Sequence, residues 1–186
     1  MGREPIDPPI YVCSVEGLNV AARLIGASRL ISLLNPEMMA ELATPAEIAP
    51  HNHLRLVMSD IVAPAPGRVL PTAEHARRLI AFAAEWDGES PLLIHCRAGR
   101  SRSTAAAFII ACQLRPDLPE TDIAEAMRAS SATAQPNALL VRLGDEALNR
   151  GGRMVRAAEA IGQGDPAHNA LFRLRLPARA AEIAEA

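Results

Sequence analysis

Short apolar runs recur along the first half of the chain and predict buried β-strands. Each run is bounded by Gly, Pro, Asn or Ser, which commonly end strands. The last run, before Cys96, is apolar almost throughout, and this is typical of a strand that is covered on both faces of a sheet. We expect strands over residues 10–15, 29–34, 53–58 and 91–95.

Apolar residues at helical spacing lie between these runs and beyond them. A segment rich in small residues, which suits a helix packed closely on a sheet, follows the last strand. Strands interleaved with helices, and then helices alone, predict an α/β fold with a central, mostly parallel sheet of four to five strands, flanking helices and a helical C-terminal half. The expected helices cover residues 16–26, 72–86 with Thr72 as N-cap, 103–114, 117–128, 137–150 and, more weakly, 153–161.

The length and the hydrophobic content suit one compact domain. The chain has 186 residues, of which 49% are hydrophobic, enough to bury a single core. We expect one domain over residues 1–161 and a C-terminal tail over 162–186 that is docked or partly mobile. Within that tail, residues 171–176 fit a strand docked on the domain.

The charge balance and the cysteine content exclude several functional classes. A net charge of −2 gives no overall basic field, so we expect no nucleic-acid partner. No apolar segment is long enough for a signal peptide or a membrane span, so we expect a cytoplasmic protein without stable membrane insertion. The three cysteines lack disulfide-framework spacing and indicate reduced thiols.

The segment from His95 to Ser103, with the sequence HCRAGRSRS, has the features of a phosphate-binding loop that carries its own thiol. It lies between a predicted strand and a predicted helix, so the backbone N–H groups of residues 97–102 can surround an anion at the helix N-terminus. Gly99 permits the close turn. The same donors favour the thiolate of Cys96, which predicts a nucleophile near neutral pH.

Three other residues of this loop have distinct expected roles. Arg102 supplies a planar fork that can hold two phosphate oxygens, and Ser103 is placed to donate a hydrogen bond to the sulfur of Cys96. We expect His95 to anchor the loop rather than to join the chemistry. The substrate phosphate would lie against Arg97, Ala98, Gly99, Arg100, Ser101 and Arg102.

This segment resembles the signature of the protein tyrosine and dual-specificity phosphatases, in which His-Cys is followed by five residues, Arg, and then Ser or Thr. The resemblance extends weakly over residues 8–150, including Pro136-Asn137 at the start of a late helix. It implies a phosphocysteine intermediate, no metal and no cofactor, and an aspartic acid on a separate upstream loop. Asp60 fits that role, because it follows a predicted strand and is the only Asp between His51 and Asp87.

The substrate stays open at this level. A phosphorylated protein, with phosphotyrosine or both kinds of phosphoresidue, is the first expectation. Arg97 and Arg100 are either solvent-exposed charges or part of a more basic site, and the second case resembles phosphoinositide and phosphatidylglycerophosphate phosphatases. The oligomeric state is not predicted.

Two other functions compete with the phosphatase hypothesis. A catalytically inactive phosphate-recognition module would use the same loop, although such proteins usually lose the Cys, Arg or Asp. A rhodanese-like sulfurtransferase also has a Cys in a short loop, but it needs no terminal Arg-Ser pair.

His51 and His53 lack ligand partners at metal-binding spacing, so we interpret them as strand-entry residues. Cys13 and Cys112 are expected to be buried thiols, and the sequence leaves open whether either protects Cys96 under oxidation.

Overall fold

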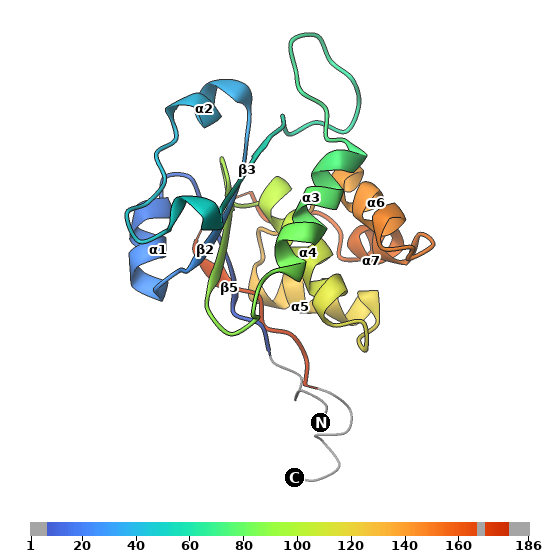
Figure 1. Cartoon of the computed structure of the whole chain (residues 1–186). Coiled ribbons are helices and arrows are strands. Elements are labelled where there is room, and N and C mark those ends of the chain that lie inside the picture. The colour runs from blue at the N-terminus through green and yellow to red at the C-terminus, as the bar shows by residue number, and fades with distance from the viewer. Residues whose placement is uncertain (1–6, 167–169, 179–186) are drawn as a thin grey trace.

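The structure, a computed structural model, describes residues 7–166 and 170–178. Its centre is a five-stranded sheet with the strand order β3-β2-β4-β1-β5 (Figure 1). The first four strands are parallel and β5 is antiparallel to β1, which confirms the predicted mostly parallel sheet. The strands are β1 (Ile10–Ser14), β2 (Arg29–Leu34), β3 (His53–Val57), β4 (Leu92–Cys96) and β5 (Phe172–Arg173).

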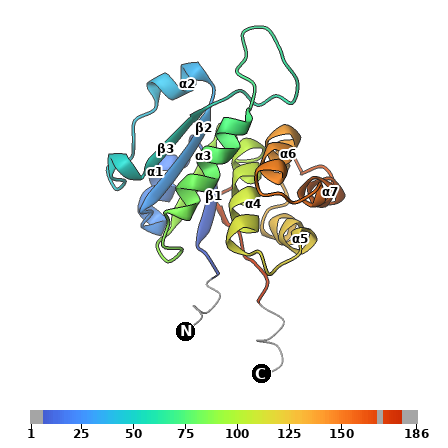
Figure 2. The same ribbon diagram turned by 45° about the vertical axis from the view of Figure 1, so that its right-hand side comes forward.

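Helices cover both faces of the sheet (Figure 2). The α1 helix covers one face, where Leu18, Ala21 and Ala22 pack with Leu30 and Leu93 of the sheet. The helices from α3 to α7 lie on the other face and form the larger part of the core. The helices are α1 (Leu18–Ile25), α2 (Pro36–Glu41), α3 (Ala73–Ala84), α4 (Arg102–Leu114), α5 (Glu120–Ser130), α6 (Ala138–Ala147) and α7 (Arg153–Ala160), with a short 3-10 turn at Pro50–Asn52.

The α4 helix is the centre of the helical layer. Every residue from Arg102 to Cys112 is buried, because the helix packs on β1, β2 and β4 and against α3, α5 and α6. Its small residues, Ala105, Ala106 and Ala107, allow the close approach to the sheet that their size predicts. The first turn of this helix is therefore fixed within the core, and its position is set by packing on several sides.

The parallel strands place the loops that follow them at one edge of the sheet. Ser14 is in register with Cys96, and β2 lies on the other side of β4. The segment after β3 leads into a long loop, which extends beyond the same edge before α3 begins (Figure 1). In parallel sheets this edge, at the carboxyl ends of the strands, is where binding sites form.

Two features differ from the sequence-based prediction. The short helix α2 follows β2 directly, with Pro36 in its first turn, where the sequence analysis placed only the end of the strand. Six residues give too little apolar periodicity for a pattern to be recognised. The strand in the C-terminal segment is shorter than residues 171–176 and pairs with β1 through Phe172 and Arg173, while Leu174 is buried in the core.

Among residues 7–166 and 170–178, no helix has the length and apolar character that crossing a bilayer requires.

Candidate active site

The loop between β4 and α4 lies at the carboxyl edge of the sheet, next to the strand at its centre. Its close turn depends on Gly99, which has a φ of 71°. A Cβ atom at this position would lie 2.8 Å from the carbonyl carbon of Cys13, closer than such atoms approach. The N–H of Val15 donates to the carbonyl of Arg97 at 3.2 Å. The end of β1 therefore presses directly on the loop, and only glycine fits this contact.

Cys96 is the last residue of β4 and is almost fully buried. Its Sγ lies 3.2 Å from the Oγ of Ser103 in the first turn of α4. The loop from Arg97 to Ser101 brings the N-terminus of this helix next to the sulfur. A thiolate at this place has a hydroxyl donor and the positive end of a helix for stabilisation.

Arg102 is 95% buried, since only 5% of its surface is exposed. Its Nη1 donates to the carbonyl of Met58 at 2.8 Å, which ties the start of α4 to the segment after β3. Its Nε is buried and has no hydrogen-bond partner among the described residues. A buried donor normally has a partner. The Nη1 of the guanidinium is thus used in the contact with Met58. The Nε remains available to donate a hydrogen bond to an anion.

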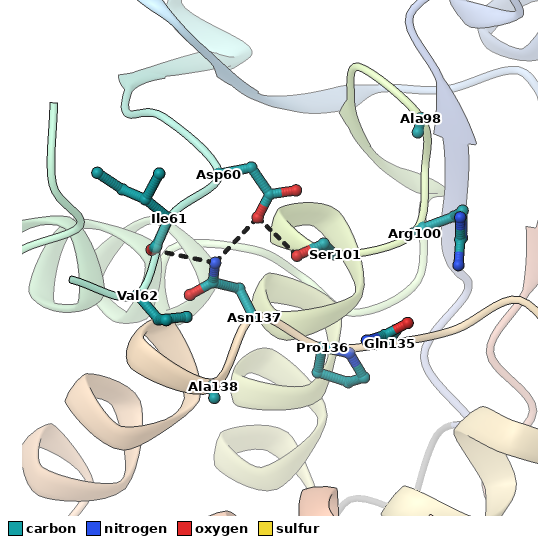
Figure 3. A pocket seen from close by; sticks show the side chains of 10 residues that line it. All are labelled: Asp60, Ile61, Val62, Ala98, Arg100, Ser101, Gln135, Pro136, Asn137 and Ala138. Carbon is teal, nitrogen blue, oxygen red and sulfur yellow. Dashed lines mark hydrogen bonds between the residues drawn. The ribbon is translucent and has the colours of Figure 1, made fainter. Parts of the chain in front are cut away.

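Asp60 lies beside Ser101, the last residue of the loop, and is held by two donors (Figure 3). The hydroxyl of Ser101 donates to its Oδ1 at 2.7 Å, and the Nδ2 of Asn137 donates to the same oxygen at 2.9 Å. Both hydrogen bonds end on Oδ1, and no donor of the described residues reaches Oδ2. The arrangement leaves Oδ2 as the oxygen on which a proton can be carried and given up.

The loop that carries Asp60 is closed at its base. The N–H of Ser59 donates to the carbonyl of Val69 at 2.7 Å, and the N–H of Val69 donates to the Oγ of Ser59 at 3.1 Å. These bonds pin the two ends of the loop together, which brings Arg68 back to the edge from which Asp60 starts.

Asn137 is a site residue that the sequence analysis named only as the start of a helix. Its Oδ1 accepts from the N–H of Leu140 at 3.0 Å and caps α6, while its Nδ2 reaches Asp60. The capping role is visible in the sequence as Pro-Asn before an apolar helix. The contact with Asp60 joins residues 77 positions apart and has no local signal.

Two pockets adjoin the loop, and Asp60 lines both. The first, of about 310 Å³, has Arg102 in its wall. The second, of about 460 Å³, is lined by Ser101 and Asn137. The two additional arginines of the loop are divided between them: Arg97 lines the first pocket, together with Arg68, and Arg100 lines the second.

Arg100 lies on the far side of Ser101 from Asp60 (Figure 3). Its Nε donates to the carbonyl of Thr133 at 3.4 Å. The side chains of Arg68 and Arg97, in contrast, make no hydrogen bond or ion pair with any described residue. The structure thereby separates two residues that are equivalent in the sequence pattern: Arg100 braces the loop, and Arg97 is an unpaired cation at the pocket with Arg102.

His95 is fully buried on the opposite face of β4 from Cys96. Its Nε2 lies 2.6 Å from the Oγ of Ser32 on the neighbouring strand, and the same Oγ lies 2.8 Å from the Nε2 of His53. Burial lowers the pKa of His95 to about 4, and burial together with the charge of Arg55 lowers the pKa of His53 to about 4. Both imidazoles are therefore neutral near pH 7. His53 begins β3, where the sequence analysis placed it, but its contact with Ser32 was not foreseen.

The other two cysteines lie outside the loop that follows Cys96. Cys13 packs under α1 on the opposite face of the sheet, and Cys112 lies near the far end of α4. Burial raises the pKa of each thiol to about 12. No group of three or more His, Cys, Asp or Glu side chains in the described ranges is arranged to hold a metal ion.

The difference in environment predicts selective alkylation. At pH 7.5 iodoacetamide should modify Cys96 and leave Cys13 and Cys112 unmodified. All three side chains are buried, but a pKa of about 12 keeps the thiols of Cys13 and Cys112 protonated, whereas Cys96 lies beside the Ser103 hydroxyl and the N-terminus of α4. Peptide mass spectrometry of the native protein measures this directly, with protein unfolded in urea as the control in which all three react. Modification of Cys13 or Cys112 at the rate of Cys96 would contradict it.

The chain is similar to known proteins in structure but not detectably in sequence. No protein-family model and no curated protein sequence matches the chain. The crystal structure of DUSP15 is similar with a TM-score of 0.55 at 20% identity, covering 83% of this chain and 93% of that one. The PTPMT1 structure in complex with PI(5)P has a TM-score of 0.55 at 17% identity and covers 80% and 97%. A human tyrosine phosphatase-like serine/threonine/tyrosine-interacting protein has a TM-score of 0.55 at 18% identity and covers 78% and 95%.

The chain has the protein tyrosine phosphatase fold. The similarity extends over about 80% of the chain. At sequence identities of 17% to 20%, the similarity shows the fold but not the activity. In this chain the fold brings Cys96, Arg102 and Asp60 to the same edge of the sheet.

Proposed function

We propose that the protein is a metal-independent, cysteine-dependent phosphatase that hydrolyses phosphomonoesters through a phosphocysteine intermediate. One observation supports this most directly. The unpartnered Nε of the buried Arg102 and the carboxyl of Asp60 belong to residues that line the same pocket, at the mouth of the loop that begins with Cys96. This supports a phosphate clamp and a proton donor that act on one small ester, next to the loop that Cys96 begins.

In the first step the thiolate of Cys96 attacks phosphorus, and the bond from phosphorus to the leaving oxygen breaks. Arg102 and the loop N–H groups hold the other three oxygens, where negative charge spreads in the transition state. The proton on Oδ2 of Asp60 passes to the leaving oxygen. The products of this step are the free alcohol or phenol and a phosphorylated Cys96.

In the second step water attacks the phosphorus of phosphocysteine. The carboxylate of Asp60 takes a proton from that water, and the bond between sulfur and phosphorus breaks. The hydroxyl of Ser103, 3.2 Å from the sulfur, donates to the departing thiolate and stabilises it. Inorganic phosphate leaves, and both Cys96 and Asp60 return to their starting protonation states.

Hydrolysis of p-nitrophenyl phosphate in the presence of EDTA tests this proposal. We expect turnover that is unaffected by the chelator and inhibited by vanadate, because vanadate adopts the geometry of the transition state in the same cradle. Protein that is folded but shows no turnover, or turnover that disappears with EDTA, would contradict the proposal.

Replacing the acid of Asp60 by an amide should lower the rate by a factor that depends on the leaving group. We expect Asp60→Asn to lower kcat/KM by about 100-fold for an alkyl phosphate and by much less for p-nitrophenyl phosphate, whose leaving group needs little protonation. Steady-state kinetics over a series of leaving groups measures this. Asp122→Asn, on helix α5, is the matched control and should behave as the wild type. An equal loss for every leaving group would show that Asp60 is not the acid.

The inactive recognition module is the less favoured alternative. One protein of the same fold is described as phosphatase-like and as an interacting protein, so the fold alone does not decide between hydrolysis and binding. The presence of Cys96, Arg102 and Asp60 together favours hydrolysis. Tight binding of phosphorylated ligands without turnover would favour the module.

Arg68 and Arg97 support a second candidate for the substrate. Both line the pocket that Arg102 faces, and neither is neutralised by a carboxylate of the described chain. Two unpaired cations beside the phosphate clamp favour an ester that carries further negative charge, such as a phosphorylated lipid head group, over a phosphotyrosine side chain. Comparison of a phosphotyrosine peptide with phosphoinositides and phosphatidylglycerophosphate separates the two candidates.

A further inference from the structure

The loop that carries Asp60 continues into a segment without any polar side chain. Residues 61–67, here called the apolar loop, have the sequence IVAPAPG. Every residue from Val62 to Arg68 is exposed, and 59% of the surface of Val62 is accessible to solvent. These side chains contribute nothing to the core, so the folding of the domain does not account for an unbroken apolar sequence at this place.

The apolar loop lies beyond the same edge of the sheet as the candidate active site. Both views show it as the outermost described segment at this edge, where it extends past α2 and the two carboxylates of that helix, Glu37 and Glu41 (Figure 1 and Figure 2). A broad surface that approaches this end of the molecule therefore meets the apolar loop first and faces the opening of the site.

Hydrogen bonds at both ends keep the apolar loop in shape. At its base, the closure described above joins the two ends of the loop. At its tip, the N–H of Arg68 donates to the carbonyl of Ala65 at 3.2 Å. Between them lie Pro66 and Gly67, whose φ of 68° fits the third residue of a type II turn. A loop that is already ordered loses little conformational entropy when it docks on a surface.

Positive charge borders the apolar loop on the side of the active site. Arg68 is the only charged residue between Asp60 and Glu74, and the carboxylate of Glu74 is paired with Arg77. Arg97, which is also exposed, lines the same pocket as Arg68. An apolar tip with unpaired arginines behind it matches a bilayer that contains anionic lipids, in which acyl chains lie beneath negative head groups.

A protein that recognises proline-rich segments fits this loop less well. Such proteins bind extended sequences with prolines at P-x-x-P spacing, whereas Pro64 and Pro66 are two positions apart. The turn that begins at Ala65 also ends any extended structure at this point. The loop therefore favours a lipid surface over a groove of this kind.

We propose that the apolar loop docks the protein on a membrane surface that contains anionic lipids. Its nonpolar side chains enter the boundary between head groups and acyl chains, and Arg68 and Arg97 lie among the head groups. The contact is peripheral and reversible, because a short loop buries far less apolar surface than a spanning helix. Docking turns the opening of the phosphate loop toward the lipid head groups.

Cosedimentation of the full chain with vesicles tests the docking. We expect binding to phosphatidylcholine vesicles with about 30% phosphatidylglycerol, and about tenfold weaker binding without the anionic lipid or in about 0.5 M NaCl. Neither lipid is a phosphomonoester, so the result does not depend on whether the protein is a phosphatase. Folded protein that does not bind the anionic vesicles would overturn the proposal.

Variants at the tip test which surface makes the contact. The double variant Ala63→Asp and Ala65→Asp should weaken binding to anionic vesicles at least about tenfold, because a carboxylate resists burial and is repelled by anionic lipids. Both side chains are exposed and line neither pocket, so hydrolysis of p-nitrophenyl phosphate should be unchanged.

The matched control changes the other exposed apolar pair, Val20 and Leu24 on α1, with the same change in net charge. Val20→Asp with Leu24→Asp should bind vesicles as the wild type does, because α1 covers a face of the sheet. Loss of binding in this control, with normal binding in the loop variant, would place the contact on α1 and overturn the proposal.

A tryptophan substitution locates the contact directly. With anionic vesicles, the emission of Ala65→Trp should shift to shorter wavelength and be quenched by brominated phosphatidylcholine, and Leu24→Trp should show neither effect. Trp86 is the only tryptophan of the chain and is 7% exposed, so it gives a constant background. Quenching in Leu24→Trp but not in Ala65→Trp would contradict the proposal even if vesicles are bound.

The consequence for turnover rests on the proposed function. The variant with aspartates at positions 63 and 65 should lower kcat/KM about tenfold for phosphatidylglycerophosphate in vesicles, and should not change it for a short-chain, water-soluble form of the same lipid. Normal vesicle binding by this variant, with a loss of turnover on a phosphorylated protein, would indicate a protein partner and overturn the proposal. If the protein proves not to be a phosphatase, vesicle binding and tryptophan quenching still decide.

Discussion

Cys96→Ser is expected to reduce phosphatase turnover by at least about four orders of magnitude. A serine hydroxyl at this position stays protonated near neutral pH, and the donors that stabilise a thiolate do not make it a comparable nucleophile. The rest of the loop would be intact, so the variant should still bind vanadate or phosphate. Single-turnover kinetics with p-nitrophenyl phosphate and an anion-binding titration measure the two properties.

Cys112→Ser is the matched control for this result. Cys112 is buried in α4 away from the loop, so its replacement should leave kcat/KM nearly unchanged even if stability falls. Substantial turnover by a folded Cys96→Ser protein would exclude the thiol mechanism. Equal losses in both variants would indicate a general structural defect.

Arg102→Lys is expected to lower kcat by about 1,000-fold although it preserves the charge. A lysine ammonium is a point charge and cannot hold the Met58 carbonyl and two phosphate oxygens in one plane. Because the fork acts most strongly where charge spreads over the phosphoryl oxygens, the loss should be larger in kcat than in the affinity for phosphate. Steady-state kinetics combined with phosphate binding separates these quantities.

Arg100→Lys is the control in the same loop. Its guanidinium contacts the carbonyl of Thr133 and lines the other pocket, so kcat should change little. Near-normal kcat in Arg102→Lys would show that charge alone suffices and that the fork geometry is not needed. A loss in Arg100→Lys as large as that in Arg102→Lys would indicate a disturbed loop.

The parts of the site that the sequence predicts are those that depend on local order. The strand, the close turn at Gly99 and the helix that begins at Arg102 follow one another within a single segment. The order and spacing of these residues in the sequence are therefore enough to predict the shape of the loop. Asp60 could be named because the resemblance to the phosphatase signature implies an upstream aspartic acid, and Asp60 is the only Asp between His51 and Asp87. The fold class follows from the same alternation of strands and helices.

The remaining parts depend on contacts between distant segments. Asn137 reaches Asp60 across 77 positions, and the packing of α6 on α4 determines that distance. Arg68 comes near Arg97 through the Ser59–Val69 closure of a loop that has no regular structure. The partnership of Ser32, His53 and His95 depends on strand order, and the order β3-β2-β4 is not the order of the sequence. No local pattern contains this information.

Capture of the phosphoenzyme tests the central claim most directly. Protein mixed with excess p-nitrophenyl phosphate, quenched within milliseconds and digested, should contain a peptide with one phosphoryl group on Cys96, and Asp60→Asn should increase its amount by slowing hydrolysis. Turnover without any phosphocysteine, or with phosphate on His95 or on another residue, would contradict the account.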